Sequence, residues 1–95
     1  MSLKISGLSI EYLKISVTAE TDVRPFPVYV CLKPLGDPAP SEWNTAQWDS
    51  SATDPYIIRY LLDGSQFTKG RYYVWVRIDG PVEKPVAKVG VLEIF

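Results

Sequence analysis

The fold is decided by residues 70–79, which read GRYYVWVRID. Aromatic and β-branched side chains dominate this stretch, and both types favour the pleated surface of a β-strand. Alternation along a strand sends neighbouring side chains to opposite faces, and it divides the stretch into Tyr72, Val74, Val76 and Ile78 on one face and Tyr73, Trp75, Arg77 and Asp79 on the other. We expect the first set to face a core and the second to face outward.

The same period of two recurs along the rest of the chain. Further strands are predicted at residues 3–6, 8–18, 27–33, 53–62 and 86–95, with turn-forming residues between them. The apolar set slips by one residue between Tyr12 and Leu13, which turns the apolar face over unless a bulge or a break absorbs the slip, and we expect a bend there. Residues 34–54 predict a long loop, with its one plausible helical turn at residues 41–46.

This pattern predicts an all-β fold, an immunoglobulin-like antiparallel β-sandwich of about seven strands. Tyr72 follows a turn and lies at the start of the strongest predicted strand. In immunoglobulin-like sandwiches, a tyrosine at this place forms the tyrosine corner, in which its hydroxyl hydrogen-bonds to the backbone of the preceding segment. Cys31 is the only cysteine, so the fold has no internal disulfide. The 95 residues fit a single domain, residues 1–95.

Composition argues against two classes of partner. The net charge is −1 and the basic residues form no stripe, which argues against nucleic acid. The apolar runs are only a few residues long, so no membrane span is expected. The alternating N-terminus lacks the continuous apolar stretch of a signal peptide.

Catalytic chemistry finds little support in the sequence. The chain has no histidine, which removes the commonest general base and the commonest metal ligand. Alternation places Cys31 on the outward face of its strand, where we expect it to be a small residue of a half-buried surface. The sequence identifies no general base that would activate its thiol. The loop carboxylates have no metal-ligand spacing, and no glycine-rich phosphate loop is present. We therefore expect no catalytic residues, no metal and no cofactor.

A surface for binding another chain is the better-supported hypothesis. Tyr, Trp and Arg are enriched at the centres of protein interfaces, and the outward row Tyr73, Trp75 and Arg77 holds one of each. Tyr29, outward on its own strand, is a weaker addition. The alternative is that cross-strand neighbours or the loop at residues 34–54 cover this row. An unpaired edge strand is a second candidate contact, by strand addition.

Trp43 and Trp48 lie in SEWNTAQWDSS, residues 41–51, and two interpretations of them remain open. A long loop can fold large side chains over the open end of a small sandwich, which would make both rings part of the core. Alternatively, the two rings form a stacking platform for sugars, and the protein is a carbohydrate-binding module for a cell-surface polysaccharide.

Three blocks of sequence resemble one family. They are LSIEYLKISVTA at residues 8–19, the middle block of Trp43, Ala46, Trp48, Asp49 and Tyr56, and the C-terminal segment of residues 70–94. The C-terminal segment matches at Gly70, Tyr72, Val74, Trp75, Val76, Arg77, Asp79, Pro81, Glu83, Pro85, Val86, Gly90, Leu92 and Ile94. These blocks resemble the small immunoglobulin-like structural and accessory proteins of tailed phages and prophages, which are similar in architecture to the N-terminal domain of phage baseplate upper proteins.

The resemblance implies a structural or assembly protein and not an enzyme. Its expected partners are further copies of itself, as a homo-oligomer, or other phage structural proteins. It also implies synthesis in the bacterial cytoplasm without a signal peptide, and incorporation into a virion.

Overall fold

The computed structural model describes residues 2–95, with the side chain of Pro40 left aside, and shows an all-β fold. The strands are β1 (Ser2–Ile5), β2 (Ile10–Val17), β3 (Val28–Lys33), β4 (Asn44–Thr45), β5 (Gln47–Thr53), β6 (Tyr56–Asp63), β7 (Gly70–Ile78) and β8 (Val86–Ile94). Two short 3-10 helices interrupt them, η1 (Pro40–Glu42) and η2 (Gly64–Gln66). Cys31 is free, so no disulfide is present.

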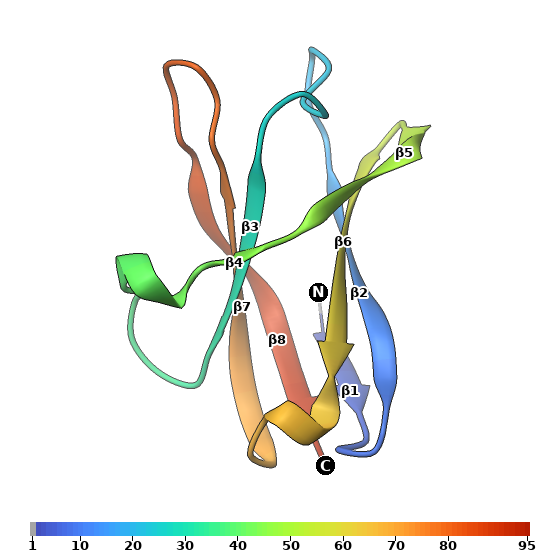
Figure 1. Ribbon diagram of the computed structural model, residues 1–95, viewed down its shortest axis with the longest axis vertical. Coiled ribbons are helices and arrows are strands. Elements are labelled where there is room, and N and C mark those ends of the chain that lie inside the picture. The colour runs from blue at the N-terminus through green and yellow to red at the C-terminus, as the bar shows by residue number, and fades with distance from the viewer. Residues whose placement is uncertain (1) are drawn as a thin grey trace.

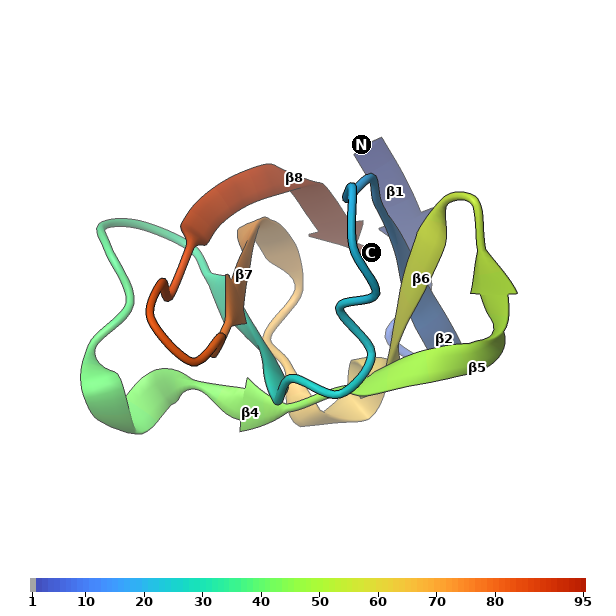
Figure 2. The ribbon, with the colours of Figure 1, turned by 90° about the horizontal axis from the view of Figure 1, so that it is seen from above.

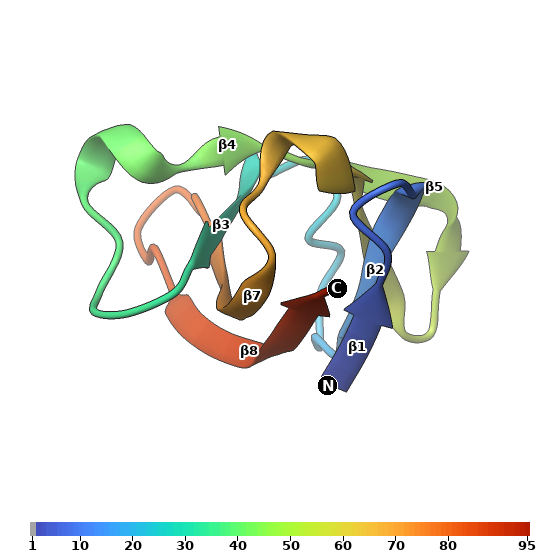
Figure 3. The same cartoon turned by 90° about the horizontal axis from the view of Figure 1, so that it is seen from below.

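The strands form two sheets that face each other as a sandwich (Figure 1). The order in the five-stranded sheet is β1-β8-β7-β3-β4, and in the three-stranded sheet it is β2-β6-β5. Viewed from above, the two layers are separate, and the green segment of β4 and β5 passes from one to the other (Figure 2). The pairings are antiparallel as predicted, except that β1 runs parallel to β8, beside which it lies in Figure 3.

The core fills the space between the two sheets, and the alternation in the sequence accounts for it. Its buried members are Ile5, Leu13, Ile15, Val28, Val30, Ala46, Ile58, Leu62, Val74, Val76, Leu92 and Ile94. The inward set predicted for residues 70–79 is confirmed, because Val74 and Val76 are buried and Tyr72 and Ile78 pack against the core. The Tyr72 hydroxyl donates to the Thr68 carbonyl at 2.6 Å, which is the hydrogen bond expected of a tyrosine corner.

Two expectations need correction. The predicted loop at residues 34–54 contains β4 and β5, and its helical turn is a single 3-10 turn at Pro40–Glu42 instead of one at residues 41–46. The strand β2 has no bulge at Tyr12, because it pairs with β6 in one unbroken register. The apolar face therefore does turn over: Leu13 is buried, whereas Tyr12 is 46% exposed.

Candidate functional site

The four side chains predicted as a partner-binding surface lie on one face of the five-stranded sheet. Tyr29 on β3 pairs with Arg77 on β7, and the pairings Cys31–Trp75 and Lys33–Tyr73 follow along the same ladder. Directly opposed residues share a face in an antiparallel pair, so Tyr29, Tyr73, Trp75 and Arg77 all point away from the core. Each of the four is partly exposed.

Trp43 reaches the same face from the segment between β3 and β4. The chain reverses at η1, becomes extended at Trp43, and pairs through β4 with Tyr29 and Val30 of β3. The Arg77 guanidinium carbon lies 4.3 Å from the centre of the Tyr29 ring and 5.2 Å from that of Trp43. We call the outward surface of Tyr29, Trp43, Tyr73, Trp75 and Arg77 the aromatic face.

Positive charges lie over the rings of the aromatic face. Lys88 Nζ is 4.6 Å from the centre of the Tyr73 ring and 5.9 Å from that of Trp75. Arg77 also pairs with Asp79, with 2.9 Å between Nε and Oδ1. A cation over an aromatic ring stabilises by roughly 0.5–1 kcal/mol where water has access. The face thus offers apolar ring surface and positive charge together.

Trp75 carries a polar atom that the rest of the chain leaves unpaired. Its indole Nε1 is buried and has no hydrogen-bond acceptor among residues 2–95. A buried donor without an acceptor costs about 1–3 kcal/mol, so such a group calls for an explanation. The Trp75 side chain is partly exposed, but this N–H is not, so its exposed surface is that of the ring carbons.

Cys31 lies on this face too, but it is more buried than expected. Its exposed fraction is 2%, although the residue lies outside the core cluster, opposite Trp75. The β3–β4 register, continued by one residue, places Trp43 level with it on the other side. Burial raises the pKa of the Cys31 thiol, with Glu42 adding to the rise, so the protonated form is favoured.

Glu42 connects the segment that carries Trp43 to the end of β3 through hydrogen bonds. Its carboxylate accepts hydrogen bonds from Lys33 Nζ at 2.5 Å and from the Ala39 amide at 2.7 Å. These bonds, the one from Lys33 first, hold the pKa of Glu42 below its ordinary value of 4.5. A lowered pKa in the folded state means that this contribution to stability is present above about pH 4.5 and is lost as the pH falls through the folded pKa.

We therefore expect Glu42→Gln to be less stable than the unmodified chain at neutral pH, with the difference closing as the pH falls below 4.5. Thermal unfolding followed by circular dichroism from pH 7 to pH 2 measures both curves. The NMR signal of the Trp43 indole N–H should shift with pH in the unmodified chain and not in the variant. Parallel stability curves over the whole range would show that Glu42 carries no acid-sensitive stabilisation.

The two tryptophans of residues 41–51 lie in different surroundings. Trp48, on β5, packs against the core cluster, and its Nε1 donates to the Phe26 carbonyl at 2.8 Å. The ring also meets Tyr56 edge to face, with 6.4 Å between ring centres. Trp43 contacts Arg77 on the aromatic face instead. The structure thus favours the core interpretation for Trp48, and the two rings do not form one platform.

A second outward surface was not predicted, and it lies on the three-stranded sheet. Ile10, Tyr12 and Leu61 are 64%, 46% and 54% exposed, and Tyr12 pairs directly with Leu61. The Arg59 guanidinium carbon lies 4.2 Å from the centre of the Tyr12 ring. The slip of the apolar set at Tyr12 is the sequence signal for this surface, because it leaves Ile10 and Tyr12 outward while Leu13 faces the core.

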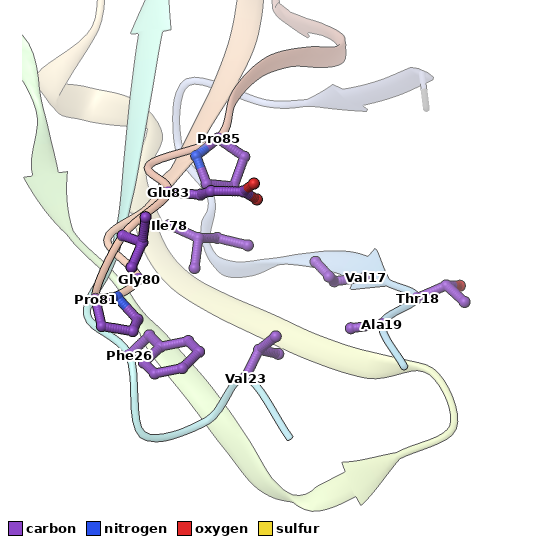
Figure 4. Close-up of a pocket in the computed structure, with 11 residues that line it drawn as sticks. Val17, Thr18, Ala19, Val23, Phe26, Ile78, Gly80, Pro81, Glu83 and Pro85 are labelled. Carbon is purple, nitrogen blue, oxygen red and sulfur yellow. The ribbon is translucent and has the colours of Figure 1, made fainter. Parts of the chain in front are cut away.

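One end of the sandwich holds an apolar pocket of about 510 Å³ (Figure 4). The last residue of β2, Val17, and Val23 of the segment after it line one side, and the connection between β7 and β8 contributes Pro81 and Pro85. Glu83 is the only ionisable side chain of the lining. In the described part of the chain there is no cluster of three or more metal-binding side chains, and no helix is long and apolar enough to cross a membrane.

Comparison with known proteins found no matching family model, no matching curated protein and no matching solved structure.

Proposed function

We propose that this protein works by binding another protein through the aromatic face and has no catalytic activity. The observation that carries the proposal is the gathering of two tyrosines, two tryptophans and Arg77 on one outward sheet surface. Rings and guanidinium groups of this kind supply most of the binding energy at protein interfaces.

The assembly we propose is the particle of a tailed phage, with the chain as a structural or assembly component of a phage or prophage. This part of the proposal rests on the resemblance of three sequence blocks to small immunoglobulin-like phage proteins. The all-β sandwich and the Tyr72–Thr68 hydrogen bond are what such a protein would have. Either self-association or docking into a ring or tail would use the aromatic face.

The test is incorporation into particles. We expect mass spectrometry of phage particles, induced from the bacterium that encodes the chain, to find it at stoichiometric levels. Trp75→Ala, supplied in place of the native protein, should reduce incorporation at least tenfold, because truncating a central interface tryptophan costs about 2 kcal/mol or more. Leu35→Ala is the matched control, since Leu35 is 79% exposed and lies outside the aromatic face.

Circular dichroism and thermal unfolding must show that Trp75→Ala is folded. If that variant does not fold, Tyr73→Ser is tested in its place. Absence of the unmodified chain from well-formed particles would contradict the virion role. Normal incorporation of folded Trp75→Ala would contradict the aromatic face as the binding surface. A shift of tryptophan fluorescence on adding cell-surface polysaccharide, lost in Trp43→Ala, would instead assign the face to sugar.

A further inference from the structure

The two sheets have four edges, and three of them are poorly suited to pairing with another chain. Strand β4 has two residues, β1 has four, and β5 has a register shift between Trp48 and Thr53. Short strands and bulges are the usual protection against pairing between molecules. The fourth edge is β2, with eight residues in unbroken register against β6 and no proline or glycine.

The free side of β2 presents backbone groups at regular intervals. The Gly64 amide donates to the Ser9 carbonyl at 2.9 Å, which fixes the alternation of the β2–β6 ladder. It follows that Ile10, Tyr12, Lys14 and Ser16 direct their amides and carbonyls away from β6. Within residues 2–95, no backbone hydrogen bond reaches the free side of β2.

The side chains beside this edge are complementary to a reversed copy of themselves. The centre of the outward surface is apolar, with Tyr12 opposite Leu61. On one side of it, Lys14 lies opposite Arg59, and both positive charges help to lower the pKa of Asp49 on β5, after the hydrogen bonds from Ser51. On the other side, Ile10 lies opposite Asp63, whose pKa is lowered by hydrogen bonds from Ser65. One end is thus basic and the other acidic.

We propose that β2 pairs antiparallel with β2 of a second copy of this chain, about a two-fold axis at Tyr12. The two three-stranded sheets then form one continuous sheet across the axis. Tyr12 meets Tyr12 of the other copy, which joins the two apolar centres. Lys14 lies opposite Ile10 of the other copy, and that Ile10 is paired with Asp63 of its own copy. The basic end of each copy therefore lies beside the acidic end of the other.

Neighbouring registers fit less well. A one-residue slip would place outward side chains of one copy against inward side chains of the other. A two-fold axis at Lys14 would set two lysines directly opposite each other, which is destabilising. An axis at Leu13 would bring Lys14 of the other copy to the Tyr12 ring, where Arg59 already lies 4.2 Å away. This contact surface lies on the sheet opposite the aromatic face and does not depend on the function proposed for that face.

Disulfide trapping tests both the dimer and its register. Directly opposed, hydrogen-bonded residues have Cα atoms about 5.5 Å apart, a separation that a disulfide can span. Tyr12→Cys should therefore form a covalent dimer under mild oxidation with oxidised glutathione. Lys14→Cys is the matched control, because four strand residues, roughly 13 Å, separate its two copies in the proposed register. The unmodified chain should not cross-link, because Cys31 is 2% exposed.

Sedimentation equilibrium of the unmodified chain should show a monomer–dimer equilibrium, and Tyr12→Lys should weaken it at least tenfold. Leu35→Lys, a similar change at an exposed site, should leave it intact. A chain that stays monomeric at millimolar concentration overturns the proposal. Cross-linking through Lys14→Cys but not through Tyr12→Cys overturns the register.

Discussion

Replacing Gly64 with alanine is expected to lower the free energy of unfolding by about 2–3 kcal/mol, in the range of an overpacked interior. A Cβ atom at this buried position would lie 2.6 Å from the Ser6 carbonyl oxygen and 3.1 Å from the Gly7 Cα. Both clashing atoms belong to the backbone, and hydrogen bonds hold both residues in place. The Ser6 carbonyl accepts from the Ser9 amide at 3.0 Å, and the Gly7 amide donates to the Phe95 carbonyl at 2.8 Å.

Urea unfolding followed by circular dichroism measures this loss, and the melting temperature should fall by roughly 10–20 °C in a domain of this size. Gly7→Ala is the matched control, because its Cβ would come no closer than 3.6 Å to a neighbour, the Phe95 carbonyl oxygen. We expect that variant to stay within about 1 kcal/mol of the unmodified chain. Equal stability of Gly64→Ala would mean that the turn between β1 and β2 moves aside freely.

The strands that the sequence predicts well are those with one face against the core. Along β7 each inward residue needs an apolar side chain and each outward one does not, so alternation identifies both the strand and its faces. Alternation along β6 likewise puts Ile58 and Leu62 on one face, and both are buried. For these strands the local pattern and the packing carry the same information.

The edge strands β4 and β5 were missed because little in their own residues requires them. Asn44 and Thr45 of β4 are both exposed, and they are strand because they pair with Val30 and Tyr29 of β3. Along β5, Trp48 is the residue that packs against the core cluster. Hydrogen bonds to a partner far away in the sequence determine these elements, and no local pattern reports such a partner.

The candidate site was predictable to the extent that it lies on one strand. Tyr73, Trp75 and Arg77 follow from the period of two on β7, and Tyr29 follows from the same period on β3. The arrival of Trp43 could not be predicted, because it depends on the chain reversal at η1 and on the register of β4 against β3. The pairing of Tyr12 with Leu61 likewise depends on the register between β2 and β6.

The two proposed contact surfaces lie on different sheets, and this arrangement has a consequence for assembly. A two-fold contact through β2 closes on itself and yields a dimer. That dimer would still present two aromatic faces, one on each copy. A chain of this design can join two partners that it contacts separately, which is the behaviour expected of an assembly component. Trp75→Ala and Tyr12→Lys should therefore affect the two contacts independently.

The two tryptophans of residues 41–51 should respond very differently to truncation. Trp48→Ala is expected to lower the free energy of unfolding by about 3–4 kcal/mol, because it removes a large ring that packs against the core. It also leaves the Phe26 carbonyl without the indole donor, now at 2.8 Å. Trp43→Ala should cost at most about 1 kcal/mol, the value of a cation–aromatic contact at an accessible site.

Urea unfolding of both variants measures this contrast. Trp48→Phe then separates the two causes of the loss in Trp48→Ala, the missing ring and the missing hydrogen bond. Phenylalanine keeps most of the ring but not the indole N–H, so its loss should be about 1–2 kcal/mol, the cost of the missing hydrogen bond. If Trp43→Ala proved as damaging as Trp48→Ala, the ring of Trp43 would be part of what holds the sandwich together. The aromatic face would then lose a member whose exposure the binding proposal needs, and Tyr73 and Trp75 would carry that proposal without it.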